Sequence, residues 1–290
     1  LRGHLKSPYA YYLMLPALLV YALLFVLPAL SGLLLSFFNV KSFKLSTITF
    51  AGLENYATVL RNPYFSIAIK NTLLFAVVTT LGIFGMALAL LVNQRFHGVN
   101  YMRTVFFLPA VLNNVAVGLV FRSMMHPSGL INQTLSAMGL DMLMHNWLTD
   151  AKIAIFSCAF VEIWKWTGYT MVIFLAGLQS IDKTYYEAAQ LDGATYWQQL
   201  RSVTIPLIMP ALNNAVVISV VGGLKVFDIV QSLTNGGPGN ATSVFGTLIY
   251  SSFSSGSYGR GCAASMILTF FVLLIALPTN RFISRKEVEV

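Results

Sequence analysis

The sequence is poor in charge. Only 10% of its 290 residues are Asp, Glu, Lys or Arg, whereas 57% are hydrophobic and the mean hydropathy is +0.72. Because a soluble protein carries roughly 25% charged residues, this composition excludes an ordinary soluble domain and indicates a polytopic helical membrane protein. The net charge of +8 suits basic ends on the cytoplasmic side of a bilayer and gives no reason to expect nucleic-acid binding.

Cysteine and the common catalytic motifs are also scarce. The two cysteines, Cys158 and Cys262, fall in apolar runs, so a disulfide framework is excluded and both are predicted to be small core residues. Gly-Lys-Ser, Gly-Lys-Thr, His-Glu-x-x-His and Gly-x-Ser-x-Gly do not occur, and the four histidines are scattered. The chain is therefore expected not to be an enzyme, with no ATPase site, no metal site and no bound cofactor of its own.

Six long apolar runs are present, and each has about the 20 residues that cross ~30 Å of hydrocarbon as a helix. They cover residues 13–38, 65–92, 105–125, 153–178, 207–233 and 263–282. The runs are continuous and do not alternate, so they indicate helices and not barrel strands. We therefore predict an all-α polytopic membrane protein, with six transmembrane helices in a single domain over residues 1–290. No convincing internal repeat is present, which weighs against an inverted-repeat secondary transporter.

The first apolar run follows Arg2 and Lys6, an arrangement that a secretory signal peptide also has. The run is longer than the 7–15 residues of a signal-peptide core, so a retained first span is predicted. Because no methionine opens the chain, the natural N-terminus is expected to precede residue 1.

Lysine and arginine in the connections predict the orientation, because cytoplasmic loops carry an excess of both. With the N-terminus in the cytoplasm, the cytoplasmic set is Arg2, Lys6, Arg95, Arg103, Lys183, Arg201, Arg281, Arg285 and Lys286. The opposite side keeps Lys41, Lys44 and Arg61, with Arg122, Lys152 and Arg260 near span ends. Both termini are predicted to be cytoplasmic, and so is the connection that follows the fourth span.

Residues 185–210, YYEAAQLDGATYWQQLRSVTIPLIMP, form a mixed-charge connection between two apolar runs. Residues 186–191 are mostly good helix formers, Gly193 offers a position for positive φ, and residues 197–201 can resume a helix. Pro206 marks the entry to the next span. A helix–turn–helix on the membrane face is predicted over residues 182–206. The alternative is a loop that only connects two spans.

This stretch resembles the EAA loop of binding-protein-dependent ABC importer permeases through Glu187-Ala188-Ala189, Asp192-Gly193-Ala194, Trp197-Gln198 and Ile205-Pro206. Leu200 departs from the Phe that relatives usually carry. The resemblance implies a type I importer permease fold in a bacterial cytoplasmic (inner) membrane. It also implies that a separate ATPase subunit docks on Glu187, Ala188, Ala189, Asp192, Gly193 and Ala194.

The same resemblance implies a set of partners. They are a second homologous permease, forming a homodimer or a heterodimer with this chain, two ATP-binding subunits that hold ATP and Mg, and an extracytoplasmic binding protein. Further segments resemble the carbohydrate-uptake branch, of the maltose and glycerol-phosphate type: Asn71-Thr72, Arg103-Thr104, Phe106-Phe107-Leu108-Pro109, Gly129-Leu130-Ile131-Asn132 and Gly236-Gly237-Pro238. Asn113-Asn114 and Cys262 depart from that pattern.

The function implied is that of a saccharide importer permease in the lipid bilayer. Alternatives are a permease of the same class for another solute such as glycerol phosphate, or a channel or secondary transporter that needs no ATPase.

Polar side chains inside apolar runs are candidates for a translocation path, because they are costly in hydrocarbon. Glu162 and Lys165 are three residues apart, which places both on one helix face, and Lys225 and Asp228 repeat this spacing. Trp164, Trp166 and Tyr169 lie beside the first pair, and aromatic faces next to hydrogen-bonding groups suit sugars. The predicted path residues are Glu162, Trp164, Lys165, Tyr169, Asn113, Asn114, Lys225, Asp228 and Gln231.

Simpler interpretations of these residues stay open. Each charged pair could be an ion pair that only cancels charge, and the aromatic side chains could pack against lipid. The two lysines would suit an acidic sugar, although each has an acidic neighbour.

Overall fold

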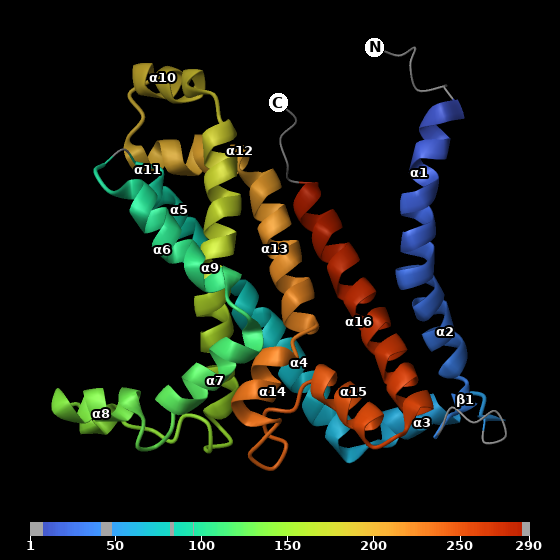
Figure 1. The fold of residues 1–290 in the computed structure, drawn as a ribbon. Coiled ribbons are helices and arrows are strands. Elements are labelled where there is room, and N and C mark those ends of the chain that lie inside the picture. The colour runs from blue at the N-terminus through green and yellow to red at the C-terminus, as the bar shows by residue number, and fades with distance from the viewer. Residues whose placement is uncertain (1–7, 42–47, 82–83, 95, 286–290) are drawn as a thin grey trace. The chain divides into compact units, whose positions relative to one another are not determined.

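The computed structural model describes residues 8–41, 48–81, 84–94 and 96–285, most of which lie in helices (Figure 1). Five cations used to predict the orientation lie outside these residues: Arg2, Lys6, Lys44, Arg95 and Lys286. The chain forms two compact units, Leu1–Asn62 with Ile249–Ile267, and Pro63–Leu248 with Leu268–Val290.

The first unit begins with a long apolar helix. It runs through α1 (Pro8–Tyr21), a π-helical turn η1 (Ala22–Val26) and α2 (Leu27–Leu35). Residues Met14–Leu35 have a mean hydropathy of 2.5, and none of them is buried within the chain. A helix that is apolar on all sides must be covered by lipid or by another chain, so this element agrees with the predicted first span.

A short antiparallel strand pair follows, β1 (Phe38–Asn39) with β2 (Thr49–Phe50), and then α3 (Glu54–Arg61). The buried Asn55 amide donates from Nδ2 to the carbonyl oxygens of Ser36 and Phe38, both at 2.9 Å. This side chain ties α3 to the end of α2. Two later helices, α15 (Phe245–Ser254) and α16 (Tyr258–Ser284), belong partly to this unit.

The second unit contains the helices that build the candidate site. In chain order they are α4 (Pro63–Leu81), α5 (Phe84–Val92), α6 (Val99–Val111), α7 (Asn114–Met124), α8 (Leu130–Ala137), the 3₁₀ turn η3 (Asp141–Leu143), α9 (Ala154–Ser180), α10 (Lys183–Leu191), α11 (Tyr196–Gln199), the π-helical turn η4 (Leu200–Thr204), α12 (Ile205–Leu207), α13 (Met209–Leu224) and α14 (Asp228–Thr234). The central helix is α9, which packs against α4, α5, α6, α13 and α14. In Figure 1, α10 and α11 lie at one end of α9, whereas α7 and α14 lie near its other end.

In the part of the chain that the structure describes, three stretches are helical and apolar enough to cross a membrane: Met14–Leu35, Pro63–Val92 apart from residues 82–83, and Tyr258–Ser284. The number rises to five among the described residues if each of two bent helix pairs is one span. The bounds of α9 match the predicted fourth span, and it has 27 residues, but Glu162 and Lys165 interrupt its apolar character. The helical character of the chain is confirmed, whereas the count of six spans stays a prediction.

The predicted third span, 105–125, is two helices and not one. The axes of α6 and α7 differ in direction by 97°. Leu112 leaves the helical region with ψ 147, and Asn113 accepts hydrogen bonds in its Oδ1 from the N–H groups of Val115 (2.8 Å) and Ala116 (3.3 Å). An asparagine cap starts a new helix, so the break has a local cause.

The predicted fifth span, 207–233, is not one continuous helix. The axes of the helical segment Tyr196–Leu207 and of α13 differ in direction by 67°. α13 ends at Leu224, directly after Gly222 and Gly223. Glycine has low helix propensity, and the chain leaves the helix before α14 begins at Asp228. Lys225 and Asp228 are therefore not on one helix, and the predicted pairing on a single helix face is wrong.

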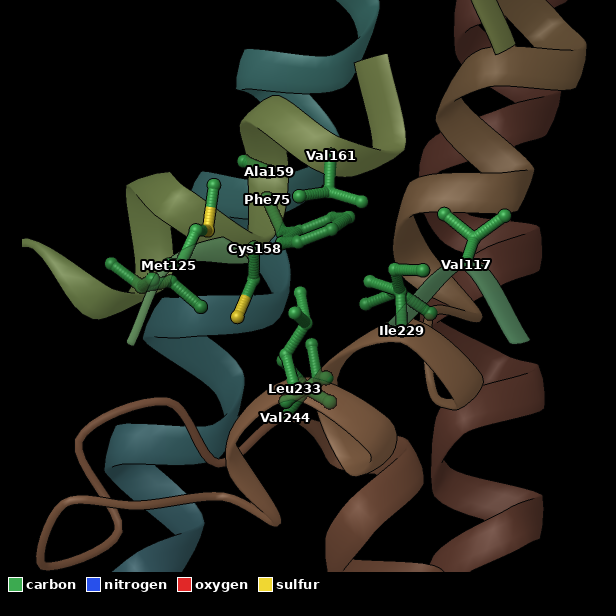
Figure 2. Packing of buried hydrophobic residues seen from close by; sticks show 12 residues of the cluster. Phe75, Val117, Met125, Cys158, Ala159, Val161, Ile229, Leu233 and Val244 are labelled. Atoms are coloured by element: carbon green, nitrogen blue, oxygen red, sulfur yellow. The ribbon is translucent and has the colours of Figure 1, made fainter. Parts of the chain in front are cut away.

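A buried core joins α4, α7, α9 and α14. Figure 2 shows side chains from these helices pointing toward one another, and the cluster consists of Phe75, Val117, Met125, Ile155, Cys158, Ala159, Val161, Val226, Ile229, Val230, Leu233 and Val244. Both cysteines are free and buried, which confirms their prediction as small core residues. Because this core fixes α14 against α9, it sets the position of Asp228 relative to Glu162.

Candidate functional site

The connection after α9 forms a helical hairpin, residues 182–207, in which α10 and α11 flank a tight turn. Gly193 has φ +76, the left-handed conformation that the sequence predicts there. Its N–H donates to the carbonyl of Gln190 at 3.0 Å, and the N–H of Ala194 donates to the carbonyl of Ala189 at 2.9 Å. These two bonds are those of a Schellman turn, which ends a helix at a residue with positive φ.

Both short helices have side-chain caps at their N-termini. Asp182 accepts a hydrogen bond in Oδ1 from the N–H of Thr184 at 2.9 Å, and this bond, with one from the Thr184 side chain, lowers the pKa of Asp182. Its contribution to the helix is therefore present above the ordinary aspartate pKa and is lost as the pH falls through the lowered value. In α11, Thr195 and Gln198 form a capping box.

Two further bonds hold the hairpin together. The hydroxyl groups of Tyr186 in α10 and Thr204 in η4 lie 3.1 Å apart, and Gln199 donates from Nε2 to the carbonyl of Ala194 at 2.9 Å. A cleft of about 730 Å³ lies between the hairpin and the ends of α5 and α9, and its described wall includes Arg103 and Lys183. The hairpin is thus a small, internally bonded structure and not a loose loop.

The outer face of the helical hairpin is open to a partner. Of the six residues predicted to dock on an ATPase, Glu187, Ala188, Asp192 and Gly193 are exposed, and Ala189 and Ala194 are half-buried. Beside them, Leu191 is 91% exposed and Trp197 is 74% exposed. Large apolar side chains that are exposed together with charged ones are typical of a protein-docking surface.

A cavity of about 510 Å³ lies among α4, α7, α9, α13 and the start of α14. Its walls combine apolar side chains with the aromatic rings of Trp166, Tyr169 and Phe227. Five of the predicted path residues line it, and they come from three different segments: Asn114, Glu162, Tyr169, Lys225 and Asp228. The structure therefore brings together residues that are more than a hundred positions apart in sequence.

One face of α9 supplies a wall of this cavity. Glu162, Trp166 and Tyr169 are spaced at i, i+4 and i+7, so helix geometry places them in one stripe. Trp164 is two residues from Glu162, which turns it by roughly 200° to another side of the helix. Its ring packs against Phe121 with centroids 5.0 Å apart, and it does not line the cavity.

Three other predicted path residues also do not line the cavity. Lys165 is buried and lies with Nζ 4.6 Å from the centroid of the Trp166 ring, behind the wall. Asn113 caps α7, and Gln231 donates from Nε2 to Oδ1 of Asn235 at 2.5 Å. The cavity has further polar lining residues that sequence reasoning missed, namely Thr79, Thr167, Thr170 and Ser219. Thr170 follows Glu162 at i+8, so the helical stripe on α9 could have indicated it.

Some polar atoms around the cavity have no hydrogen-bond partner among the described residues. Asn114 donates from Nδ2 to Oδ2 of Asp228 at 3.2 Å. Oδ1 of Asn114 and Oε2 of Glu162 are buried and have no hydrogen-bond partner among the described residues. An acceptor left in this state costs about 1–3 kcal/mol, so a hydrogen-bond donor that reached either oxygen would stabilise the site.

The family of the chain follows from comparison with known proteins. Residues 82–285 match the family described as "Binding-protein-dependent transport system inner membrane component", and the chain belongs to this family. The trehalose/maltose transport system permease protein MalF of Thermococcus litoralis is 34% identical over 284 residues, covering 96% of this chain and 95% of the relative.

Solved structures show the same fold. A bacterial ABC transporter involved in the import of the acidic polysaccharide alginate has a chain with TM-score 0.82 and 27% identity, covering 96% of this chain and 95% of that one. A structure of the bacterial alginate transporter in complex with an alginate pentasaccharide-bound periplasmic protein gives TM-score 0.82 and 28% identity, with coverage of 97% and 96%. These matches extend over almost the whole chain.

Proposed function

We propose that this chain is the membrane-spanning permease subunit of an ATP-driven importer for a saccharide. One observation carries the proposal: a cavity with polar and aromatic walls is connected through α9 and α13 to an exposed helical hairpin. The cavity suits a hydroxyl-rich solute, and the hairpin suits an ATPase subunit outside the membrane. The names of a trehalose/maltose permease and of an alginate importer support saccharides as the substrate class.

The proposed assembly has several subunits. A second homologous permease completes the path, two ATP-binding subunits hold ATP and Mg and dock on the helical hairpins, and an extracytoplasmic binding protein delivers the sugar. The complex of the alginate transporter with a periplasmic protein supports the last of these partners. This chain contributes the path and the docking surface, and ATP hydrolysis takes place on the partners.

Six spans and a cytoplasmic location of both termini complete the proposal. The spans are α1 with α2, α4 with α5, α6 with α7, α9, α13 with α14, and α16. This orientation puts the helical hairpin in the cytoplasm and α8 on the other side of the inner membrane. Movement of the hairpin, driven by the ATPases, then opens the cavity to alternate sides.

Labelling of one exposed residue tests the docking role and the orientation together. Leu191→Cys is suitable because its side chain is 91% exposed and caps no helix. A membrane-impermeant thiol reagent should label it from the cytoplasmic side only. Co-expression of the ATP-binding subunit should slow this labelling by roughly tenfold or more, because the hairpin is then covered by an interface core that excludes solvent.

Ser136→Cys in α8 is the matched control and should be labelled from the outside at the same rate with or without the ATPase. The buried native cysteines should give little background. Labelling of Leu191→Cys from outside would overturn the orientation. An unchanged rate when the ATP-binding subunit is co-expressed would favour a channel or a secondary transporter.

A pair of tryptophans tests the path. Trp166 and Trp164 are similarly exposed, 36% and 39%, but only Trp166 lines the cavity. Trp166→Ala should lower saccharide uptake at sub-saturating concentration by about tenfold, since the loss of an aromatic face in contact with a ligand is worth about 1 kcal/mol or more. Uptake is measured with assembled complex in proteoliposomes.

Trp164→Ala serves as the control, because it removes a ring that packs against Phe121. It should lower thermal stability but leave uptake per assembled complex near that of the wild type. The opposite ranking of the two variants would place the path on another face of α9.

A further inference from the structure

Charged groups around the cavity balance one another. Among the described residues that line it, Glu162 and Asp228 carry carboxylates and Lys225 carries an ammonium group. Lys165 supplies a second positive charge from behind the wall, where it is 3% exposed. The described groups around the cavity therefore comprise two basic and two acidic side chains, and no surplus of basic groups is available to an acidic solute.

The wall also contains two buried acceptor atoms without hydrogen-bond partners among the described residues. A carboxylate can only accept, so the bond between Asn114 and Asp228 must come from the Asn114 amide nitrogen, and the amide oxygen is the atom that is left over. This oxygen and Oε2 of Glu162 are both buried without partners among the described residues. Both residues line the cavity.

We propose that the cavity selects neutral saccharides over acidic ones, with Glu162 and Asn114 as the residues that accept hydrogen bonds from sugar hydroxyls. This inference rests on the proposed function. A hydroxyl group can donate to the acceptors in the wall, whereas the carboxylate of a uronic acid brings another acceptor and a negative charge. The nearby Glu162 and Asp228 would repel that charge in a medium of low dielectric constant.

This selectivity separates the chain from the importer of the acidic polysaccharide alginate, whose fold it shares. It also bears on whether the two lysines indicate an acidic sugar as the substrate. Lys225 lies on the cavity wall beside Asp228, and Lys165 is covered by the ring of Trp166. The lysines thus balance the carboxylates of the site and do not form a site for anions.

Protection of a cysteine in the cavity tests the inference. Ser219 lines the cavity and is half-buried, and Ser219→Cys is nearly isosteric. The complete complex of permeases and ATPases is purified, and the rate of labelling with a small neutral thiol reagent is measured with increasing maltose or with increasing digalacturonate. The buried native cysteines, Cys158 and Cys262, are checked in the parent protein.

Maltose should protect the cysteine at a concentration at least tenfold lower than digalacturonate does. Equal protection, or stronger protection by digalacturonate, would overturn the neutral selectivity but leave the saccharide path intact. Absence of protection by either sugar would overturn both this inference and the proposed path.

A substitution in the wall gives an independent result. Glu162→Gln removes a negative charge and keeps one oxygen acceptor, so the preference for maltose over digalacturonate should fall by about tenfold, as expected for one hydrogen bond to a charged group. Glu54→Gln is the control, because it makes the same chemical change at an exposed position of α3 that does not line the cavity. An unchanged preference in Glu162→Gln, at normal assembly, would contradict the role of Glu162.

Discussion

Replacing Gly193 with valine should reduce transport by roughly tenfold or more while the chain still inserts and assembles. Gly193 has φ +76, and a Cβ atom added there meets nothing within 4 Å. The effect is therefore one of backbone conformation, because a β-branched residue at positive φ costs about 1–3 kcal/mol. The turn would relieve this strain by giving up its two hydrogen bonds, and α10 would lose its direction relative to α11.

Uptake and sugar-stimulated ATP hydrolysis should fall together when the assembled complex is assayed. Gly139→Val is the matched control, since Gly139 has φ +70 and also has open space around its Cβ position, but it follows α8 and lies outside the hairpin. It should suffer a similar strain and keep transport. Equal losses in the two variants would show that strain alone, and not the place of Gly193 in the hairpin, causes the defect.

Replacing Gly168 with alanine should destabilise the second unit by about 3 kcal/mol, the upper part of the range for overpacking. A Cβ atom at Gly168 would lie 1.9 Å from the carbonyl oxygen of Phe106 and 2.8 Å from Cα of Phe107. Both neighbours are backbone atoms of α6, so no side chain can rotate away and the two helices must separate. Close helix crossings in membranes depend on small residues for this reason.

The expected readouts for Gly168→Ala are a lower thermal midpoint and less monodisperse complex after extraction in detergent. Gly32→Ala, in α2, makes the same exchange in a helix where nothing lies within 4 Å of the added Cβ. It should leave the midpoint unchanged or raise it slightly, because alanine favours the helix. A midpoint of Gly168→Ala equal to that of the wild type would mean that α6 and α9 do not cross at this glycine.

Local features of the fold could be predicted from the sequence when one residue determines them. The positive φ at Gly193 and the bounds of α9 are confirmed. The third and fifth spans are predicted as single helices because hydropathy indicates which residues lie in lipid. It does not indicate where the axis of a helix changes direction. Asn113 as a cap and the glycines at the end of α13 contain the missing information, which a search for caps and breakers inside apolar runs would have found.

The candidate site was only partly predictable. The stripe of Glu162, Trp166 and Tyr169 follows from helical periodicity. The prediction of Trp164 as a path residue did not take this periodicity into account. The approach of Asn114 to Asp228 depends on the 97° bend between α6 and α7 and on the core that fixes α14. Such long-range geometry results from packing among segments that are distant in sequence, and a single sequence contains no measure of it.

One helix, α13, lies between the helical hairpin and the cavity. α13 begins one residue after α12, at a bend of 67°, has 16 residues, and is about 24 Å long. Val217, Ile218 and Ser219 on α13 line the cavity, and the non-helical residues after α13 separate it from α14. In mechanical terms, α13 is a rigid helix that is followed by a non-helical connection, residues 225–227. We expect a displacement of the hairpin to move this wall of the cavity while the core keeps α14 in place, so that no helix has to unwind.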